Sequence, residues 1–421
     1  MNKRSTASVD VSANDIAPVR YGSAELRDVI RAIGGCAKDC KQAARPIDPA
    51  IDLVRQSRLG AIRVPRADGG GGCTVREFFA MLMDLADADA DIAHILRAHY
   101  WFVEERLRSA NQEERARWLA RVVAGEIFGN AITEIGGGAA VGTWVFETKL
   151  TPSDNGHVLN GKKYYCTGSR YSDWVFVYAS TPSGGSACAL VPITREGVSF
   201  EPDDWDGIGQ RLTGSGTGMF TNVRVAPEEV MLTTVESEGG NAVQHPTDPY
   251  LVGQFVQLIL TAVIAGIMRT IVADAVAHVR KRGRTYSHAS AEKAADDPLL
   301  QAVIGQIASQ AFAAEALILA AADAQDAALA TVVQGAPDFD LTHRASLLAA
   351  QAKVIIDELA PRAATQLFDV GGSSAIKRSE DLDRHWRNVR TVASHNPTAY
   401  KARAVGDYLL NGTLLSTNGF F

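Results

Sequence analysis

The stretch Asn160-Gly161-Lys162-Lys163-Tyr164-Tyr165-Cys166-Thr167 lies at the centre of the segment that decides the fold. It opens with an Asn-Gly turn and continues into aromatic residues, which is typical of a strand that follows a hairpin turn. Similar short runs surround it between residues 127 and 230, separated by turns such as Asn155-Gly156 and Ser183-Gly184-Gly185. This spacing predicts a small antiparallel β-barrel or β-sandwich, with strands near residues 144–150, 164–167, 174–179, 187–192, 198–201 and 219–225.

The residues on both sides of this β unit have the periodicity of helices. From about 24 to 125, apolar residues recur every three or four positions, and Thr74 with Glu77 has the pattern of a capping box. After the β unit, long segments rich in Ala, Ile and Leu predict a four-helix-type bundle. The sequence therefore predicts an α+β protein of three domains: an N-terminal helical domain (1–126), a central antiparallel β domain (127–234) and a C-terminal four-helix bundle (235–421).

The composition excludes several classes of protein. Of the 421 residues, 46% are hydrophobic and 21% charged, which is a globular composition rather than a disordered one. The net charge is −6 and the basic residues form no stripe, so we expect no nucleic-acid partner. The uncharged stretch from Leu251 to Met268 contains Gln and Thr, which favours a buried helix over a membrane span. Met1–Ala13 lacks an apolar segment and the five cysteines are scattered, so we expect a cytoplasmic protein without a metal site.

Four segments resemble the acyl-CoA dehydrogenase family, in the same order and at similar spacing. Gly129–Glu134 resembles the strand entry of that family, and Asn160–Thr167 resembles its second flavin segment. Gly209–Ser215 resembles the third β segment. Gln366 with Gly371-Gly372 resembles the late helix end that reaches a neighbouring subunit's cofactor. The resemblance implies an acyl-CoA dehydrogenase-like fold and a bound flavin.

The resemblance also implies which residues hold the flavin. The Ala131–Thr133 strand end would meet the pyrimidine edge, Thr167 would lie near N5, and Tyr165 would lie against the ring. Arg282 is the first candidate cation for the flavin phosphate and Arg284 the second, although Ser287 replaces the Gly that the family has shortly after. The implied cofactor-binding residues are Asn130, Ala131, Thr133, Tyr165, Thr167, Arg282, Arg284, Gln366, Gly371, Gly372, Ser394 and Asn396.

The catalytic carboxylate of the dehydrogenases is missing. Most members carry a Glu where this chain has Asn396, and a minority carry it near Val256, where nothing acidic stands either. The segment from Leu382 through Ser394-His395-Asn396-Pro397 instead resembles the branch of reduced-flavin-dependent monooxygenases that includes dibenzothiophene monooxygenase. Histidine suits the oxygen chemistry of that branch because it can give or take a proton near neutral pH.

The resemblance to that branch implies a two-component monooxygenase. Reduced FMN (with FAD possible) would come from a separate NAD(P)H-dependent flavin reductase and would react with O2 to a C4a-hydroperoxyflavin. This adduct would oxygenate a small apolar substrate, first of all an organosulfur compound, or else an amine or an aromatic ring. The implied catalytic residues are His395, His99 and Thr167, and the expected pocket residues are Tyr100, Trp101, Phe102 and Trp205.

His94 lies on a different helix face from His99, so we give it little weight as a site residue.

The same residues leave two alternative functions open and predict an assembly state. An acyl-CoA dehydrogenase or oxidase with a displaced base, such as Glu134 or Glu380, is the alternative enzyme, and a catalytically silent scaffold is the third possibility. Family members are mostly tetramers, and the apolar segment Val303–Val332 could bury such an interface, so we expect a homotetramer.

Overall fold

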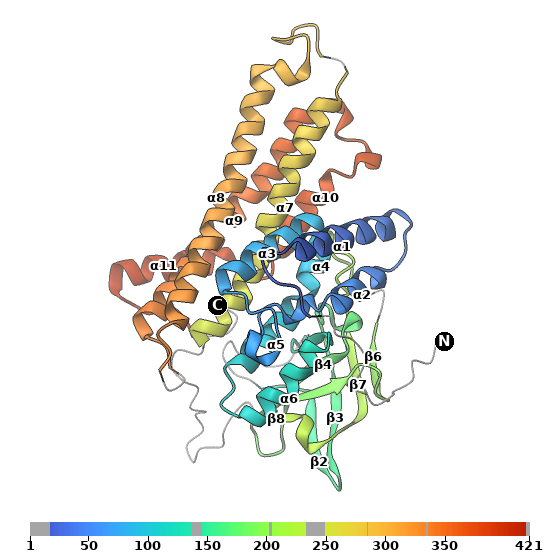
Figure 1. The fold of residues 1–421 in the computed structure, drawn as a ribbon, viewed down its shortest axis with the longest axis vertical. Helices are drawn as coiled ribbons and strands as arrows, with labels where there is room; N and C mark the ends of the chain where they lie inside the picture. Colours follow the sequence, from blue (N-terminus) through green and yellow to red (C-terminus); the bar gives the residue numbers. More distant parts are fainter. Residues whose placement is uncertain are drawn as a thin grey trace.

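The computed structural model describes residues 17–135, 145–201, 204–232, 249–283, 285–333 and 336–417. Figure 1 shows a base formed by the N-terminal helices and the sheet, with the long C-terminal helices rising from it. The N-terminal helices are α1 (Ala24–Gln42), α2 (Asp48–Gln56), α3 (Val75–Ala88), α4 (Ala90–Ile95), α5 (Arg97–Leu107) and α6 (Gln112–Val123). The predicted capping box begins α3: the Thr74 hydroxyl accepts from the Glu77 N–H, and the Glu77 carboxylate accepts from the Thr74 N–H.

The central unit is one mixed eight-stranded sheet. Its strands are β1 (Phe128–Ala131), β2 (Lys149–Ser153), β3 (Gly156–Lys163), β4 (Trp174–Ser180), β5 (Ser186–Pro192), β6 (Val198–Phe200), β7 (Gly218–Val225) and β8 (Val230–Leu232). They run in the order β6-β7-β3-β2-β4-β5-β8, with β1 also paired to β4. Most pairs are antiparallel as predicted, but β1 and β2 pair with β4 in parallel.

The strand predicted at 164–167 is a loop in the structure. Tyr164 forms an isolated antiparallel bridge with Thr133. Tyr165 then adopts a left-handed backbone conformation with φ of 55°, which a strand cannot accommodate. The chain therefore leaves the sheet at Tyr165 and presents that side chain to solvent.

The C-terminal helices form a bundle around one buried helix. After a π-helical turn at Pro249–Gly253 come α7 (Gln254–Lys281), α8 (Pro298–Leu329), α9 (Phe339–Gly371), α10 (Asp383–Ala393) and α11 (Thr398–Asn411). Within the described residues, Tyr250–Lys281 and Pro298–Leu329 are long and apolar enough to cross a membrane. The apolar window of the first is 94% buried inside the protein, so α7 is the core helix of the bundle, as the sequence predicted.

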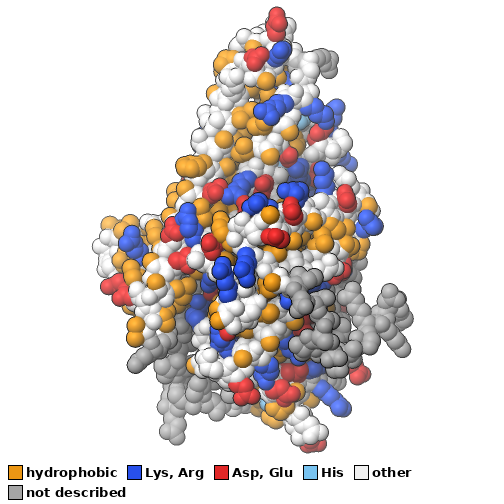
Figure 2. Space-filling view, in the orientation of Figure 1, with side chains coloured by type: hydrophobic (Ala, Val, Ile, Leu, Met, Phe, Trp, Pro, Cys, Tyr) orange, Lys and Arg blue, Asp and Glu red, His pale blue; other side chains and the backbone are white. Residues whose placement is uncertain are grey.

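Helix α8 is different, because only 22% of its apolar window is buried. Leu299 and Phe312 leave 70% and 72% of their surfaces exposed. Figure 2 shows hydrophobic side chains along the outer side of the bundle. An exposed apolar face of this length is typical of a surface that another protein covers.

The N-terminal helices and the bundle share one hydrophobic core. Phe78 of α3 stacks on Phe255 of α7 with ring centroids 5.0 Å apart. Gly266 of α7 lies directly against Ala86 of α3, where a Cβ on the glycine would overlap it. The two helical units are therefore packed together without an intervening layer, while their independence as domains stays a prediction.

Candidate active site at the junction of sheet and bundle

Two aromatic side chains mark the edge of the β unit beside the predicted flavin segment. Tyr165 is exposed, and the ring of Trp205 meets it edge-on at a centroid distance of 6.2 Å. The Trp205 indole N–H donates to the Gln210 carbonyl over 2.8 Å, which fixes the orientation of the indole. An exposed aromatic pair of this kind forms an apolar wall against which a planar ring can pack.

A chain of hydroxyl groups leads from Gln210 to Thr167. The Thr213 hydroxyl donates to the Gln210 carbonyl over 2.8 Å, and the Ser215 hydroxyl lies 2.7 Å from both Thr213 and Thr167. Each hydroxyl has one proton. Because Thr213 gives its proton to Gln210, Ser215 must donate to Thr213, and Thr167 must donate to Ser215. The remaining capacity of the half-buried Thr167 hydroxyl is therefore that of an acceptor.

Gln210 connects the three parts of the molecule. Its backbone is left-handed, with φ of 52°, and its N–H donates to the Asn388 side chain of α10 over 2.8 Å. Its side-chain oxygen lies 3.0 Å from Nδ1 of His94 on α4. The adjacent Gly209 allows this loop to press on α10, because a Cβ there would overlap the Arg387 carbonyl. The loop thus holds His94 and α10 in fixed positions relative to the hydroxyl chain.

His395 follows α10 and is oriented by two amide side chains. Its Nδ1 lies 3.0 Å from the Asn396 side-chain oxygen, and the Asn396 amide donates to the Gln257 side-chain oxygen of α7 over 2.7 Å. Because an amide oxygen only accepts, the proton of the neutral imidazole is on Nδ1 and its Nε2 is an acceptor.

The environment of His395 keeps its ring neutral. The side chain is exposed to solvent, yet enough protein surrounds it that burial lowers its pKa well below 6.5, with further lowering by the charges of Arg97 and His94. The structure therefore differs from the expectation of a histidine that titrates near neutrality. We call the region between His395, His94 and Arg97 the recess.

His94 and Arg97 face the same recess from α4 and α5. Burial, and then the charge of Arg97, lower the pKa of His94 to about 4, so this ring is also neutral at physiological pH. Its contact with the Gln210 amide oxygen places its proton on Nδ1 and leaves Nε2 as an acceptor. His94 is thus a second histidine near His395, to which the sequence analysis gave little weight.

His99, which we predicted to be catalytic, has a structural role instead. It is fully buried, and its Nε2 lies 3.0 Å from the Gly60 carbonyl while its Nδ1 accepts from the Phe128 N–H over 3.2 Å. Both ring nitrogens are therefore bonded to backbone groups, and the prediction of contact with flavin was wrong. The two histidines are five residues apart in the sequence, and only the long-range contact of His94 with Gln210 distinguishes them.

The expected aromatic pocket residues belong mainly to the core. The Tyr100 hydroxyl donates to the Leu59 carbonyl over 3.1 Å, and Phe102 stacks on Phe128 at 4.0 Å. Trp101 donates to Glu105 over 2.7 Å and packs against a β4 side chain. Tyr100 thus packs against helix α3, whereas Phe102 and the half-buried Trp101 pack against the sheet, so the pocket role of these three residues stays a prediction. Trp205 is the one expected pocket residue that lies beside the flavin segment.

Arg282, the predicted phosphate cation, lies beside the C-terminal end of α9 at the far end of the bundle. The Arg282 guanidinium lies 5.1 Å from the centre of the Tyr286 ring and donates to the Val370 carbonyl over 3.4 Å. Gly372, with φ of 56°, lies beside both side chains. Gln366 bonds to Gln306 and Gln310 of α8, and Arg284 lies outside the described residues.

This cluster is distant from His395 within one chain. Gln257 and Arg282 are 25 positions apart on one helix, which corresponds to about 38 Å at a rise of about 1.5 Å per residue. The ribbon in Figure 1 likewise places the two ends of α7 at opposite ends of the bundle. The structure therefore does not bring the predicted phosphate residues and the predicted ring-binding residues together in a single chain.

The remaining predicted cofactor residues have mixed positions. Thr133 is exposed at the sheet end, whereas Ala131 is buried in its pairing with Val177 of β4. The Asn130 carbonyl accepts from the Ser169 hydroxyl over 2.8 Å. The Ser394 hydroxyl donates back to the Arg390 carbonyl of its own helix over 2.8 Å, so its proton is already used.

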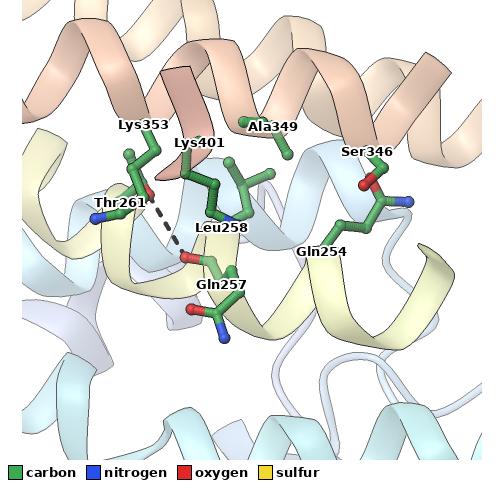
Figure 3. A pocket seen from close by; sticks show the side chains of 9 residues that line it. Gln254, Gln257, Leu258, Thr261, Ser346, Ala349, Lys353 and Lys401 are labelled. Carbon is green, nitrogen blue, oxygen red and sulfur yellow. Dashed lines mark hydrogen bonds between the residues drawn. The ribbon is translucent and has the colours of Figure 1, made fainter. Parts of the chain in front are cut away.

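A small polar cavity lies behind Gln257, between α7, α9 and α11 (Figure 3). Gln254 points into it with both amide atoms buried and without a partner among the described residues. Lys353 is paired with Asp357 at 2.6 Å, and burial followed by the charge of Lys353 lowers the pKa of Lys401 to about 7. Gln257 connects this cavity to the Asn396 and His395 pair.

Comparison with known proteins agrees with this arrangement. The family model for the acyl-CoA dehydrogenase middle domain matches residues 129–223, and that for the acyl-CoA dehydrogenase C-terminal domain matches residues 258–400. The dibenzothiophene monooxygenase of Rhodococcus erythropolis is 29% identical over 375 residues, covering 85% of this chain and 86% of the relative. The probable FMNH2-dependent monooxygenase SfnC of Pseudomonas putida is 28% identical, covering 86% of this chain and 87% of the relative.

A solved structure extends the similarity to the fold. The FMN-bound structure of TdsC from Paenibacillus sp. A11-2 is 28% identical, covers 94% of this chain and 100% of that chain, and has a TM-score of 0.82. This chain belongs to the acyl-CoA dehydrogenase superfamily, on its flavin-dependent monooxygenase branch. The predicted family and fold are thereby confirmed.

The two carboxylates considered as displaced bases of a dehydrogenase, Glu134 and Glu380, are both paired with lysines. The Glu134 carboxylate accepts from Lys163 over 2.8 Å and from the Thr148 hydroxyl over 2.6 Å, so it is a structural residue of the sheet. Glu380 lies 3.8 Å from Lys281 near the far end of the bundle. That the amide of Asn396 stands at the position of the dehydrogenase carboxylate stays a prediction from the sequence.

Proposed function

We propose that this protein is the oxygenase component of a two-component monooxygenase. It takes reduced FMN from a separate NAD(P)H-dependent flavin reductase and inserts one atom of O2 into a small substrate, first of all an organosulfur compound, or else an amine or an aromatic ring. When bound, reduced FMN would supply the oxygen chemistry by activating O2. The protein supplies the binding, orientation and proton handling.

The hydroxyl chain ending at Thr167 carries this proposal. The single protons of Thr213 and Ser215 are committed within the chain, which leaves Thr167 as an acceptor at the aromatic wall of Tyr165 and Trp205. Reduced flavin carries an N–H at N5, whereas oxidised flavin has only a lone pair there. An acceptor at this position therefore favours the reduced cofactor. The described residues fit a flavin ring through both this hydroxyl and the exposed aromatic pair.

The two histidines of the recess handle the proton. His395 and His94 each have Nδ1 bonded to an amide oxygen, so both present a neutral Nε2. A neutral Nε2 accepts the hydrogen bond of an O–H group in the recess and holds that proton in place while the ring itself stays uncharged. Neither ring is charged at neutral pH, because burial lowers both pKa values.

The phosphate end of the cofactor requires a second copy of the chain. Arg282 lies about 38 Å along α7 from Gln257, and Gly372 lies beside Arg282, so one molecule of FMN does not span both groups in one chain. We propose that these residues and Gln366 complete the site of a neighbouring subunit in a homotetramer. The exposed apolar face of α8 supports this assembly.

The experiment that tests the function is isotope incorporation. The protein is supplied with FMN, NADH and an unrelated flavin reductase under ¹⁸O2, and a panel of thiophenes, sulfides, sulfones, amines and phenols is analysed by mass spectrometry. The proposal predicts a product that is 18 mass units heavier than its substrate, because it has gained one ¹⁸O atom from O2. No such product should form when the reductase is omitted. Turnover that requires an acyl-CoA and no reductase contradicts it.

A further inference from the structure

Arg97, the first residue of α5, is a half-buried cation without an acidic partner. Its Nε donates to the Val256 carbonyl of α7 over 3.3 Å, and this is its one hydrogen bond among the described residues. In the same part of the chain, no Asp or Glu oxygen lies within 4.0 Å of its guanidinium. The two terminal nitrogens, which offer four N–H groups, are therefore available to a ligand.

Two other enclosed arginines among the described residues are paired with carboxylates. Arg63, also in the helical base, pairs with Glu104 at 2.6 Å, and Arg106 pairs with Glu114. An enclosed charge without a counter-charge is costly, and proteins normally pair it or use it to bind a ligand. The contrast with Arg63 and Arg106 therefore indicates that the counter-charge of Arg97 comes from outside the chain.

The neighbours of Arg97 place it in the recess of the active site. The Val256 carbonyl that it contacts immediately precedes Gln257, whose side chain bonds to Asn396 beside His395, and His94 lies three residues before Arg97. Both rings are neutral, and the cationic Lys353 behind them is already paired with Asp357. Arg97 is thus the one positive charge of this recess, among the described residues, that lacks an acidic partner.

The position of Arg97 favours a substrate over the cofactor ring. The ring-binding features, Tyr165 and Thr167, belong to the β unit, whereas the one contact of Arg97 is to Val256 on the core helix of the bundle. A ligand bound by Arg97 therefore lies on the helical side of the histidines. This is the side on which a substrate lies if the flavin ring packs on the β unit.

We propose that Arg97 binds an anionic group of the substrate. The substrate is then a small oxyacid, with a carboxylate or a sulfur oxyacid group held by the guanidinium and the oxygenated atom directed toward the flavin. A planar guanidinium matches such groups through paired N–H donors. This inference rests on the proposed function and narrows its substrate from an apolar molecule to an acidic one.

The test measures binding to the FMN-loaded, oxidised protein by isothermal titration, without turnover. The probes are matched pairs: benzoate with benzamide, benzenesulfinate with methyl phenyl sulfoxide, and methanesulfinate with dimethyl sulfoxide. We expect at least one acid to bind about tenfold or more tightly than its neutral partner. Arg97→Met should abolish this preference, Arg97→Lys should retain part of it, and Arg31→Met, on an exposed residue of α1, should leave it unchanged.

Two outcomes overturn the proposal. The first is that no acid binds more tightly than its neutral partner, or that the preference survives in Arg97→Met. The second is that Arg97→Met weakens the binding of FMN but not the binding of riboflavin. This result would assign the guanidinium to the cofactor phosphate. Because no oxygenation takes place in the titration, a negative result leaves the monooxygenase assignment intact, and a failure of ¹⁸O incorporation leaves the titration result valid.

Discussion

Asn396 donates a hydrogen bond from its side-chain amide to the side-chain oxygen of Gln257 over 2.7 Å. This contact anchors on the core helix α7 the amide that the sequence resemblance predicts in place of the dehydrogenase carboxylate. The amide oxygen in turn lies 3.0 Å from Nδ1 of His395. The exchange of a carboxylate for an amide thus removes the base for α-proton abstraction and gives the histidine a defined tautomer.

Restoring the carboxylate should change the pH dependence of the reaction. In Asn396→Asp a negative charge replaces the amide beside His395, and an opposite charge raises the pKa of a histidine. We expect a wild-type profile that is flat from pH 6 to 9, because the pKa of His395 lies well below 6.5, and a variant profile with a step near neutrality. The measurement is product formed per FMNH2 consumed at each pH. Asn111→Asp, at the N-cap of α6, is the matched control, and identical profiles for both variants would refute the assigned role.

The two histidines of the α4–α5 region should differ when replaced. His94→Phe removes a hydrogen-bond acceptor from the recess, so we expect the yield of oxygenated product to fall about a hundredfold, with a stability loss on the order of 1–3 kcal/mol because the buried Gln210 side-chain oxygen loses its partner. His99→Phe leaves the Gly60 carbonyl and the Phe128 N–H buried without partners, which should cost on the order of 1–3 kcal/mol for each group. Urea unfolding and product yield of both variants give the answer, and a large loss of yield in a fully stable His99→Phe would contradict the structural role.

The hydroxyl chain should set the preference for reduced FMN. In Ser215→Ala the Thr167 hydroxyl loses its acceptor and is free to donate to oxidised N5. We therefore expect the ratio of the Kd values for oxidised and reduced FMN to fall about tenfold in this variant. Anaerobic titration followed by flavin fluorescence measures both constants, and Ser183→Ala in an exposed turn provides the control. An unchanged ratio in Ser215→Ala would show that Thr167 does not contribute to the preference for reduced FMN.

Lys401 should make the protein less stable below neutral pH. Its pKa is lowered to about 7 in the folded state, first by burial and then by the charge of Lys353, whereas the unfolded value is about 10.4. The folded state therefore binds fewer protons than the unfolded state between these values, so stability rises with pH from about 7 to 10. Lys401→Met should be more stable than wild type at pH 6, on the order of a few kcal/mol, with the gain disappearing by pH 10. Thermal unfolding at pH 6, 8 and 10 tests this, and a gain that is equal at all three values would contradict it.

The sequence predicted those features that depend on neighbouring residues. The alternating segments between 127 and 230 became a sheet, the capping box at Thr74 began a helix, and the apolar stretch near Leu251 became the buried core of the bundle. The parallel pairing of β1 and β2 with β4 was not predictable, because register depends on contacts between distant segments.

The details of the site depended on such distant contacts even more. The roles of His94 and His99 follow from Gln210 and Gly60, which are 116 and 39 positions away from them, respectively. The donor direction at Thr167 follows from Ser215, which is 48 positions away. Tyr100 and Phe102 have the composition of a pocket, and only the packing of helices on the sheet shows that they are core residues.

The most direct test of the account is the reaction of the bound reduced flavin with oxygen. Reduced FMN and the protein are mixed without oxygen and then combined with oxygenated buffer in a stopped-flow spectrometer. The account predicts an intermediate that is spectrally distinct from both reduced and oxidised flavin, that persists in the wild type and that decays faster in His395→Ala. A single-phase return to oxidised flavin, together with bleaching of bound oxidised flavin by an acyl-CoA, would contradict it and identify a dehydrogenase.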